Sequence, residues 1–219
     1  MRVTAVRCRI RPMDPRDVPQ AMEIERQSFP TMWPQTVYQR ELKNPMARYL
    51  VASEVSDDHE SSARDETDRS GLLRRLLGGH PPASPTRELV IGSVGVWFMI
   101  GEAHIVTIAV REDYRRCGIG ELLLTAALEV AVEAQQEEVT LEYRISNGAA
   151  RALYEKYGFS QVGVRARYYT DNHEDAVLMT TPPLRSTEFR RLMGRRIAEQ
   201  RERWGEDHPF AGRSRKLAD

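Results

Sequence analysis

The stretch YRRCGIGELLLTAALEVA, Tyr114 to Ala131, places two glycines between an arginine pair and a long apolar helix pattern. Glycines at the start of a helix let backbone N–H groups approach an anion, which the positive end of the helix macrodipole also attracts. We therefore interpret this turn as a candidate binding site for a phosphate-containing ligand. A purely structural turn is the alternative, because two glycines alone indicate little.

Two common phosphate-binding motifs do not fit this turn. A Walker loop carries a lysine and a hydroxyl residue after its second glycine, whereas Gly120 is followed by Glu121 and Leu122. A Rossmann motif has a third glycine, but the sequence GIGELLL runs directly into apolar residues. What remains is the pattern Arg115-x-x-Gly118-x-Gly120, placed directly after a predicted strand that ends in TIAV.

The composition of the whole chain excludes several classes of protein. The 219 residues include 32 basic and 32 acidic side chains, and this balance argues against a chain-wide DNA-binding surface. The two cysteines, Cys8 and Cys117, indicate a reducing compartment rather than a disulfide framework. No signal-peptide pattern and no apolar run of about 20 residues is present, so we expect a cytoplasmic protein without a membrane span.

Changes in composition divide the chain into a domain, an insertion and a tail. We predict one domain over residues 5–183, interrupted at 55–87 by a charged segment that is too poor in apolar residues to fold and is expected to be mobile. Residues 184–219 form an arginine-rich tail, with Phe189, Leu192, Met193 and Ile197 at helical spacing. This tail is expected to be an amphipathic helix that rests on its own domain, or to be partly disordered; the alternative is a basic surface for a ribosome or an anionic membrane.

Apolar periodicity predicts alternating strands and helices along the domain. Asp14 and Pro15 have the residue types that cap and open a helix. The segment 103–110, a crossover helix and the segment 139–143 predict one parallel strand pair. We expect strands at 5–10, 48–54, 88–100, 103–110, 139–143, 161–169 and 174–181, and helices at 15–28, 34–43, 118–136, 148–157 and 185–206.

Two further stretches make the interpretation of the turn specific. They are LEYRISNGAARALYEKYGF, from Leu141 to Phe159, and RARYYTDNHEDAVLM, from Arg165 to Met179. Together with the turn they resemble the acetyltransferase (GNAT) superfamily, whose pattern is Gln/Arg-x-x-Gly-x-Gly/Ala, and within it the ribosomal-protein-alanine N-acetyltransferase (RimI-type) branch. The similarity covers roughly Ile10 to Thr181.

The resemblance implies the fold, the cosubstrate and the reaction. The implied fold is the α/β (α+β) acyl-CoA N-acyltransferase fold, a mixed and mostly antiparallel sheet of about seven strands flanked by helices. The implied cosubstrate is acetyl-CoA, without a metal. The implied acceptor is the N-terminal amine of a protein, with the N-terminal alanine of a small-subunit ribosomal protein as a candidate partner.

The resemblance also implies which residues bind acetyl-CoA. These are Ile108, Ala109 and Val110 through their backbone, the turn Arg115, Arg116, Cys117, Gly118, Ile119, Gly120 and Glu121, and Asn147. Asn147 equally suits the N-cap of the helix that follows it. Glu121 departs from the family, because many relatives carry a basic residue there. Its carboxylate would weaken phosphate binding unless it points to solvent.

Amine acetylation needs a neutral amine, an anchored thioester and an acid for the departing thiolate. An N-terminal amine has an ordinary pKa of about 8, so a carboxylate can assist its deprotonation directly or through one water. Strand alternation places Glu142 with Thr140 on one face; alone, it is more commonly a solvated carboxylate. Tyr154 alone is more commonly a core residue. The resemblance implies that Glu142 is the proton acceptor and Tyr154 the proton donor.

Four aromatic or apolar residues are candidates for contact with the acceptor. Tyr168 and Tyr169 match a tyrosine pair that lines the peptide entrance in related enzymes, although consecutive strand residues face opposite ways and only one is expected to face the peptide. Phe29 and Pro30 are candidates for a second wall. A lysine side chain or a small amine is the alternative acceptor, because one fold supports many substrates. A non-catalytic acyl-CoA-binding module is the alternative from another class.

Overall fold

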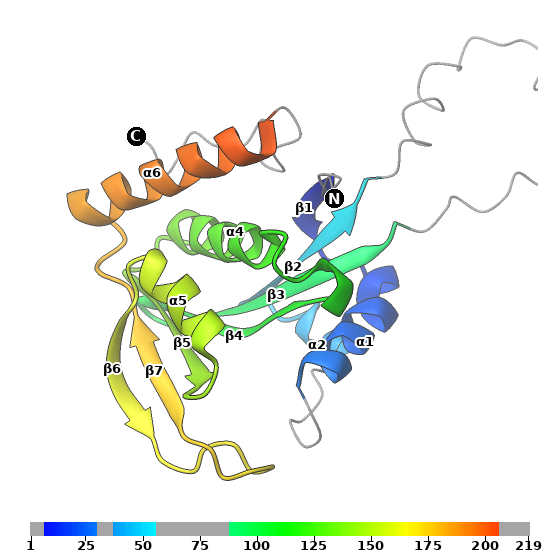
Figure 1. The fold of residues 1–219 in the computed structure, drawn as a ribbon, viewed down its shortest axis with the longest axis horizontal. Helices are drawn as coiled ribbons and strands as arrows, with labels where there is room; N and C mark the ends of the chain where they lie inside the picture. Colours follow the sequence, from blue (N-terminus) through cyan, green and yellow to red (C-terminus); the bar gives the residue numbers. More distant parts are fainter. Residues whose placement is uncertain (1–6, 30–36, 56–87, 206–219) are drawn as a thin grey trace, which may run out of the picture.

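A seven-stranded sheet organises the protein (Figure 1). The computed structural model describes residues 7–29, 37–55 and 88–205. The beginning of the first predicted strand, Pro30, the beginning of the second predicted helix, the insertion from 56 to 87 and the tail from 206 onward lie outside the described residues.

The strands follow the order β1-β2-β3-β4-β5-β7-β6 across the sheet. Neighbouring strands are antiparallel except β4 and β5, which form the predicted parallel pair. This arrangement confirms the expected mixed, mostly antiparallel fold. The strands are β1 (Cys8–Pro12), β2 (Ala47–Glu54), β3 (Val90–Phe98), β4 (Glu102–Val110), β5 (Glu138–Arg144), β6 (Ser160–Arg165) and β7 (Ala176–Thr180).

Helices cover both faces of this sheet, as Figure 1 shows. Alternation along β2 illustrates the reason: Leu50 packs in the cluster beneath α4, whereas Val51 packs in the cluster beneath α1. Asp14 caps the first helical segment through a capping box with Asp17, as predicted. The helical segments are η1 (Pro15–Asp17), α1 (Val18–Ser28), α2 (Tyr38–Glu41), η3 (Glu112–Tyr114), α4 (Ile119–Glu133), α5 (Gly148–Lys156) and α6 (Thr187–Trp204).

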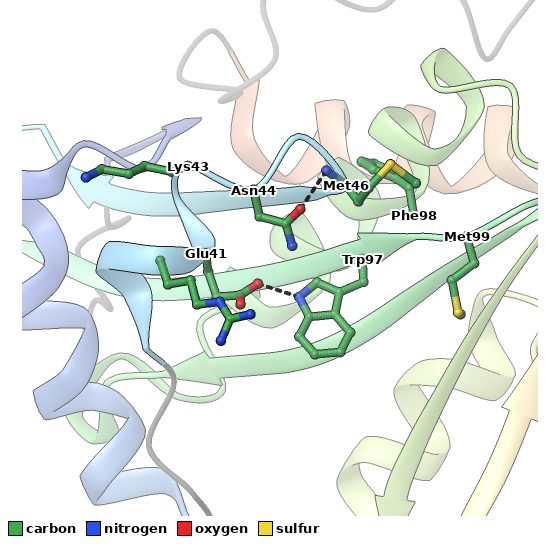
Figure 2. A pocket seen from close by; sticks show the side chains of 8 residues that line it. Glu41, Lys43, Asn44, Met46, Trp97, Phe98 and Met99 are labelled. Carbon is green, nitrogen blue, oxygen red and sulfur yellow. Dashed lines mark hydrogen bonds between the residues drawn. The ribbon is translucent and has the colours of Figure 1, made fainter.

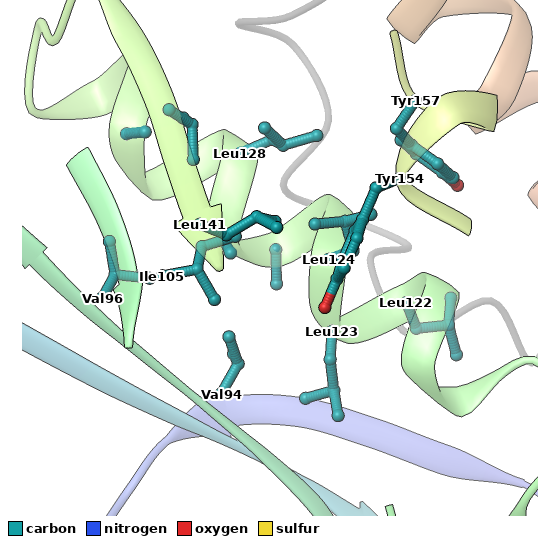
Figure 3. Packing of buried hydrophobic residues seen from close by; sticks show 14 of the residues in the cluster. Val94, Val96, Ile105, Leu122, Leu123, Leu124, Leu128, Leu141, Tyr154 and Tyr157 are labelled. Carbon is teal, nitrogen blue, oxygen red and sulfur yellow. The ribbon is translucent and has the colours of Figure 1, made fainter. Parts of the chain in front are cut away.

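The helix α4 forms the centre of the larger core (Figure 3). One stripe of this helix is buried at Leu122, Leu123, Ala126 and Ala127, whereas Ala134 is exposed at the end of the helix. Leu124, Leu128 and Ala131 are buried as well. The buried surface is wider than one stripe because α4 is covered by the sheet on one side and by α6 on the other (Figure 1).

The arginine-rich helix α6 packs onto this core. Ser186 caps it by accepting a hydrogen bond from the Phe189 N–H at 3.1 Å. Phe189, Met193 and Ile197 are buried, and burying each such side chain stabilises the protein by about 1.5–3 kcal/mol. This helix therefore rests on the domain, while its arginines lie largely outside the core.

Several element boundaries differ from the predictions. The predicted helix 15–28 begins with a 3-10 turn, the helix predicted at 34–43 is helical only at 38–41 among its described residues, and β6 ends at Arg165 rather than at 169. The chain leaves β6 because Arg167 adopts a φ of 54°, in the left-handed region. In the β3–β4 hairpin, Gly101 has a φ of 78°; β3 ends at Phe98 rather than at 100, whereas β4 begins at Glu102, one residue earlier than predicted. No described helix has the length and low charge needed to cross a bilayer.

Candidate active site

The strands β4 and β5 diverge, and a cavity lies at the point of divergence. Their pairing ends at Ile105 opposite Leu141, although β4 continues to Val110 and β5 to Arg144. The cavity measures about 560 Å³. Its lining includes the predicted site residues Phe29, Ile108, Glu142, Asn147, Tyr154, Tyr168 and Tyr169.

The free edge of β4 offers backbone groups to a ligand. The Arg111 N–H donates to the Ile91 carbonyl, and hydrogen-bonded pairs alternate along an antiparallel ladder. Ala109, two residues earlier, therefore directs its N–H and C=O toward β3. Ile108 and Val110 direct theirs toward the gap beside β5. Of the three predicted backbone contacts, these two residues are placed to reach an extended amide-rich ligand.

The glycine turn has the geometry of an anion cradle. Gly118 is the N-cap of α4 with a φ of 93°, a conformation that a residue with a side chain adopts only at a cost. The first hydrogen bond inside the helix runs from the Leu122 N–H to the Gly118 carbonyl at 3.1 Å. No described side chain caps the preceding N–H groups. These donors and the helix dipole fit a diphosphate.

The side chains of the turn are held in different ways. Arg115 donates from Nε to the Val110 carbonyl at 3.2 Å and from its second terminal nitrogen to Ser28 Oγ at 3.3 Å. This ties the turn to the end of β4 and to α1. Arg116 has a φ of 69° and is exposed. Cys117 is half-buried against the core, and its Sγ lies 3.6 Å from the Arg115 carbonyl.

Glu121 does not point freely into solvent. Its carboxylate is paired with Lys156 Nζ, accepts a hydrogen bond from the Tyr157 hydroxyl at 3.0 Å, and lies 3.9 Å from Arg203 Nη1. The side chain is 14% exposed. The departure from a basic residue at this position is therefore compensated by cations from α5 and α6. Only the backbone of Glu121 remains a candidate for contact with a phosphate.

Glu142 lies between His104 and Arg165 at the cavity. Its Oε2 lies 2.9 Å from His104 Nε2, and its Oε1 lies 3.0 Å from an Arg165 terminal nitrogen. Burial alone would raise the pKa of Glu142, but the hydrogen bond from His104 and the charges of His104 and Arg165 outweigh burial and lower that pKa. The carboxylate is thus ionised at neutral pH, although its side chain is only 8% exposed.

His104 is held on its other side by a polar chain. Its Nδ1 lies 2.7 Å from Thr140 Oγ1, and the Thr140 hydroxyl donates to Glu102. Since an ionised carboxylate only accepts hydrogen bonds, the imidazole donates to Glu142 from Nε2. This chain fixes the ring and places a proton next to Glu142.

Tyr154 lies on α5, where its side chain packs in the core and also lines the cavity. The ring is 4% exposed and packs against Tyr143 and Phe159, with centroid distances of 5.8 and 5.7 Å. Burial raises the pKa of the Tyr154 phenol, so the hydroxyl keeps its proton. No described residue hydrogen-bonds to this hydroxyl. Figure 3 shows it directed away from the hydroxyl of Tyr157, one turn farther along the helix.

Both tyrosines of the pair line the cavity, contrary to the expectation that only one would. The prediction assumed a strand, but the segment after Arg165 is a turn, so the alternation of a strand does not apply. The rings of Tyr168 and Tyr169 pack edge to face at a centroid distance of 5.3 Å. The Arg144 guanidinium lies 3.9 Å from the centre of the Tyr169 ring and fixes that ring.

Two more predicted contacts have a place in this geometry. Phe29 lines the same cavity, while Pro30 lies outside the described residues. Asn147 caps α5 by accepting a hydrogen bond from the Ala150 N–H at 3.0 Å, and it also lines the cavity. The Asn147 side-chain oxygen thus caps the helix, while the side-chain NH₂ group stays available to a ligand.

Sequence reasoning missed His104, Arg165 and Trp97. The signal for His104 was its spacing from Glu102, which places both on one face of a strand, but the pairing with β5 was unknown. Trp97 donates from Nε1 to Glu41 Oε2 at 2.8 Å (Figure 2). Trp97 and Glu41 line the cavity between β4 and β5, and they also line a second cavity of about 680 Å³ beside the β3–β4 hairpin. Within the described ranges, no group of three His, Cys, Asp or Glu side chains is arranged as a metal site.

Comparisons with known proteins identify the family. A sequence profile of the acetyltransferase (GNAT) family matches residues 18–159. The chain is 33% identical to a putative ribosomal protein bS18-alanine N-acetyltransferase of Bacillus subtilis, over 78% of this chain and 92% of that protein. It is 35% identical to an N-alpha-acetyltransferase of Sulfurisphaera tokodaii, over 76% of this chain and 87% of that protein.

Solved structures agree with the sequence comparison. The crystal structure of the ribosomal-protein-S18-alanine N-acetyltransferase from Escherichia coli has a similar fold, with a TM-score of 0.59 and 24% identity over 80% of this chain and 94% of that chain. Structures of similar fold include proteins with acetyl-CoA bound. The family match spans both the glycine turn, residues 115–121, and the two diverging strands. The chain belongs to the acetyltransferase (GNAT) family.

Proposed function

We propose that this protein transfers the acetyl group of acetyl-CoA to the N-terminal α-amine of a protein. The family supplies the reaction class and the cosubstrate. Relatives with at least 30% identity over most of the chain include one named a putative ribosomal protein bS18-alanine N-acetyltransferase and one named an N-alpha-acetyltransferase. The N-terminal alanine of a small-subunit ribosomal protein is accordingly the first candidate acceptor.

One observation carries the proposal: an ionised carboxylate and a protonated phenol line the same cavity. Glu142 comes from β5 and Tyr154 from α5, and the cavity lies where β4 and β5 separate. The opposite shifts of their pKa values suit opposite roles, because a base must be deprotonated and an acid protonated before the reaction. A module that only bound acyl-CoA would need neither group.

In the proposed mechanism the amine attacks the thioester directly. Glu142 accepts a hydrogen bond from the amine, directly or through one water, and takes the proton that the amine loses. Because the pKa of Glu142 is lowered, the carboxylate holds this proton only briefly and passes it to solvent. His104 keeps the carboxylate in position and ionised. The backbone N–H groups of Ile108 and Val110 are the candidates for polarising the acetyl carbonyl.

The leaving group needs the opposite assistance. As the carbon–sulfur bond breaks, the coenzyme A thiolate takes a proton from the Tyr154 hydroxyl. The ordinary thiol pKa is lower than the raised pKa of this phenol, so the phenol recovers its proton from solvent after the product thiol leaves. Among the described residues that line the cavity there is no cysteine, so we propose direct transfer through a ternary complex rather than a covalent intermediate.

The walls of the cavity favour a peptide as the acceptor. Tyr168, Tyr169 and Phe29 all contribute to its lining, and such aromatic surfaces suit the first residues of an extended chain. Trp97 and Glu41 extend the lining toward the second cavity, which gives the following residues a path (Figure 2). A lysine side chain is the competing acceptor, because the same chemistry applies to any amine.

The test is acetyl transfer to a peptide library whose first two residues vary, with acetylated N-termini as matched controls that retain an internal lysine. We expect mass increments on free N-termini, highest for a small first residue such as alanine, and none on blocked peptides. Transfer to blocked peptides at a comparable rate would move the assignment to lysine acetylation. Transfer only to small free amines would contradict a protein acceptor.

A further inference from the structure

The last turn of α6 lies against the glycine turn, residues 115–121, although α6 is outside the segment that matches the family. A Cβ atom built on Gly118 would lie 3.2 Å from both the Cζ and the Nη1 of Arg203. The guanidinium therefore sits directly over the N-cap of α4. Its side chain is 52% exposed, so it is accessible to a ligand as well.

The position of Arg203 follows from buried contacts earlier in the same helix. Gln200 is 3% exposed, and its side-chain nitrogen donates to Thr125 Oγ1 at 2.8 Å and to the Tyr157 hydroxyl at 2.6 Å. Thr125 belongs to α4 and Tyr157 follows α5. This network fixes the C-terminal half of α6 beside the start of α4. Arg203, less than one turn beyond Gln200, is held near the glycine turn in consequence.

The charges around the turn leave Arg203 available. Glu121 is already neutralised by Lys156, and its distance of 3.9 Å from Arg203 Nη1 is too long for a hydrogen bond. A guanidinium has five N–H donors, and among the described residues Arg203 makes no closer ion pair. The uncapped N–H groups at the start of α4 already favour an anion. A second cationic group over the same turn strengthens that preference.

We propose that Arg203 binds the diphosphate of coenzyme A together with the turn 118–121, so that the C-terminal helix completes the cosubstrate site. This inference rests on the proposed use of acetyl-CoA, but not on the identity of the acceptor amine. It assigns α6 a second role beyond covering the core. The competing explanation is indirect: Arg203 would merely screen the Glu121 carboxylate from the phosphates.

The test is the affinity of the folded, full-length protein for coenzyme A, measured by titration calorimetry without any acceptor. We expect Arg203→Gln to raise the Kd about tenfold, as the loss of one charge-assisted phosphate contact would. Arg201→Gln is the matched control: it removes the same charge from the same turn of α6, but two residues away and so on another side of the helix. We expect its Kd to stay within about twofold of the wild type.

Two further comparisons decide between the explanations. In a Glu121→Gln background, Arg203→Gln should weaken binding by the same factor, whereas disappearance of the effect would overturn direct contact in favour of screening. Dephospho-coenzyme A keeps the diphosphate and lacks the 3′-phosphate, so Arg203→Gln should weaken its binding equally. A loss confined to intact coenzyme A would overturn the assignment to the diphosphate.

The controls separate failure of this inference from failure of the proposed function. An unchanged Kd for Arg203→Gln, or an equal loss for Arg201→Gln, would overturn the role of Arg203 while the wild type still binds coenzyme A. A wild-type protein that does not bind coenzyme A at all would overturn both. Equal melting temperatures of the ligand-free variants would show that the differences come from the site rather than from unfolding.

Discussion

His104 Nε2 on β4 lies 2.9 Å from Glu142 Oε2 on β5, at the point where the pairing of these two parallel strands ends. The pair places an imidazole N–H beside the carboxylate that is the candidate base, and the Arg165 guanidinium adds a cation from β6. Together they offset the cost of burying the Glu142 charge. The lowered pKa of Glu142 on β5 thus depends on partners from two other strands, His104 on β4 and Arg165 on β6.

Glu142→Gln should abolish most of the turnover while leaving cosubstrate binding nearly unchanged. The amide keeps the shape of the side chain but cannot accept a proton, and loss of a general base lowers kcat by about 10²–10⁴. The measurement is kcat with a reactive peptide beside the Kd of coenzyme A. Glu138→Gln, on the same strand face but outside the cavity lining, is the matched control. Full activity in Glu142→Gln would contradict its role.

His104→Ala should shift the acidic limb of the kcat/KM profile to higher pH. The hydrogen bond and charge of His104 lower the pKa of Glu142, whereas burial raises it. Without His104 the burial effect gains weight, so the carboxylate is protonated at higher pH and loses its function there. The measurement is kcat/KM across pH for both proteins. An acidic limb that stays in place would mean that another group limits the reaction.

The same substitution has a consequence for stability. The folded-state pKa of Glu142 lies below its unfolded value, so its ionisation stabilises the fold above the unfolded pKa and this contribution is lost as the pH falls through the folded pKa. In His104→Ala that contribution is smaller. The difference in melting temperature between the two proteins should therefore shrink in acid, which a series of thermal scans would measure.

Tyr154→Phe should lower kcat without a comparable loss of stability. The phenyl ring keeps its packing against Tyr143 and Phe159, and only the hydroxyl disappears. Tyr157→Phe provides the contrast. Its hydroxyl bonds to Gln200 and Glu121, so its removal should lower the free energy of unfolding by about 1–3 kcal/mol and preserve kcat at saturating acetyl-CoA. The reverse assignment of the two effects would refute the choice of Tyr154 as the acid.

Local patterns predicted most of the fold. The alternation along β4 and the apolar periodicity of α4 predict elements whose apolar side chains are in fact largely buried, whereas β2 is buried on both faces from Tyr49 to Ser53. The glycine turn was also predicted, because its two glycines lie between an arginine pair and an apolar helix pattern. In the structure Gly118 adopts the left-handed conformation that glycine favours. These features depend on residues close together in the chain, and short-range sequence carries that information.

Features that depend on contacts between distant segments could not be predicted. His104 was one of several scattered histidines until the register of β4 against β5 placed it two residues from the level of Glu142. The orientation of Tyr168 and Tyr169 required the turn at Arg167, whose positive φ no propensity indicates. Arg203 reaches Gly118 only because α6 folds back over α4, which the spacing of apolar residues alone does not show.

Gly118→Ala should weaken both the fold and the binding of coenzyme A. A residue with a Cβ pays about 1–2 kcal/mol at a φ of 93°, and the new atom would lie 3.2 Å from the Arg203 guanidinium. Gly194→Ala is the control, because it lies inside α6 with nothing within 4 Å of its Cβ position. That change should instead raise the free energy of unfolding by about 0.5–1 kcal/mol. Denaturant titration and coenzyme A titration would measure both; unchanged affinity in Gly118→Ala would remove the turn from the site.

Replacing residues 56–87 by a four-residue turn should leave the fold and the activity intact. This segment joins the end of β2 to the start of β3, and these two strands are antiparallel neighbours. The Glu54 N–H donates to the Leu89 carbonyl at 2.9 Å, and Ser53 pairs with Val90. A short turn can therefore join them. Glu88 is kept in this variant because its carboxylate accepts a hydrogen bond from Arg11 Nε at 3.1 Å.

The expected change in stability has a definite sign. Each halving of a loop lowers its closure entropy cost by about 0.6 kcal/mol, so three halvings should raise the free energy of unfolding by about 2 kcal/mol. A rise in melting temperature with unchanged acetyl transfer would support an insertion that the domain does not need. A large fall would show that residues 56–87 stabilise the core, and retained stability with lost peptide transfer would place them at the acceptor site instead.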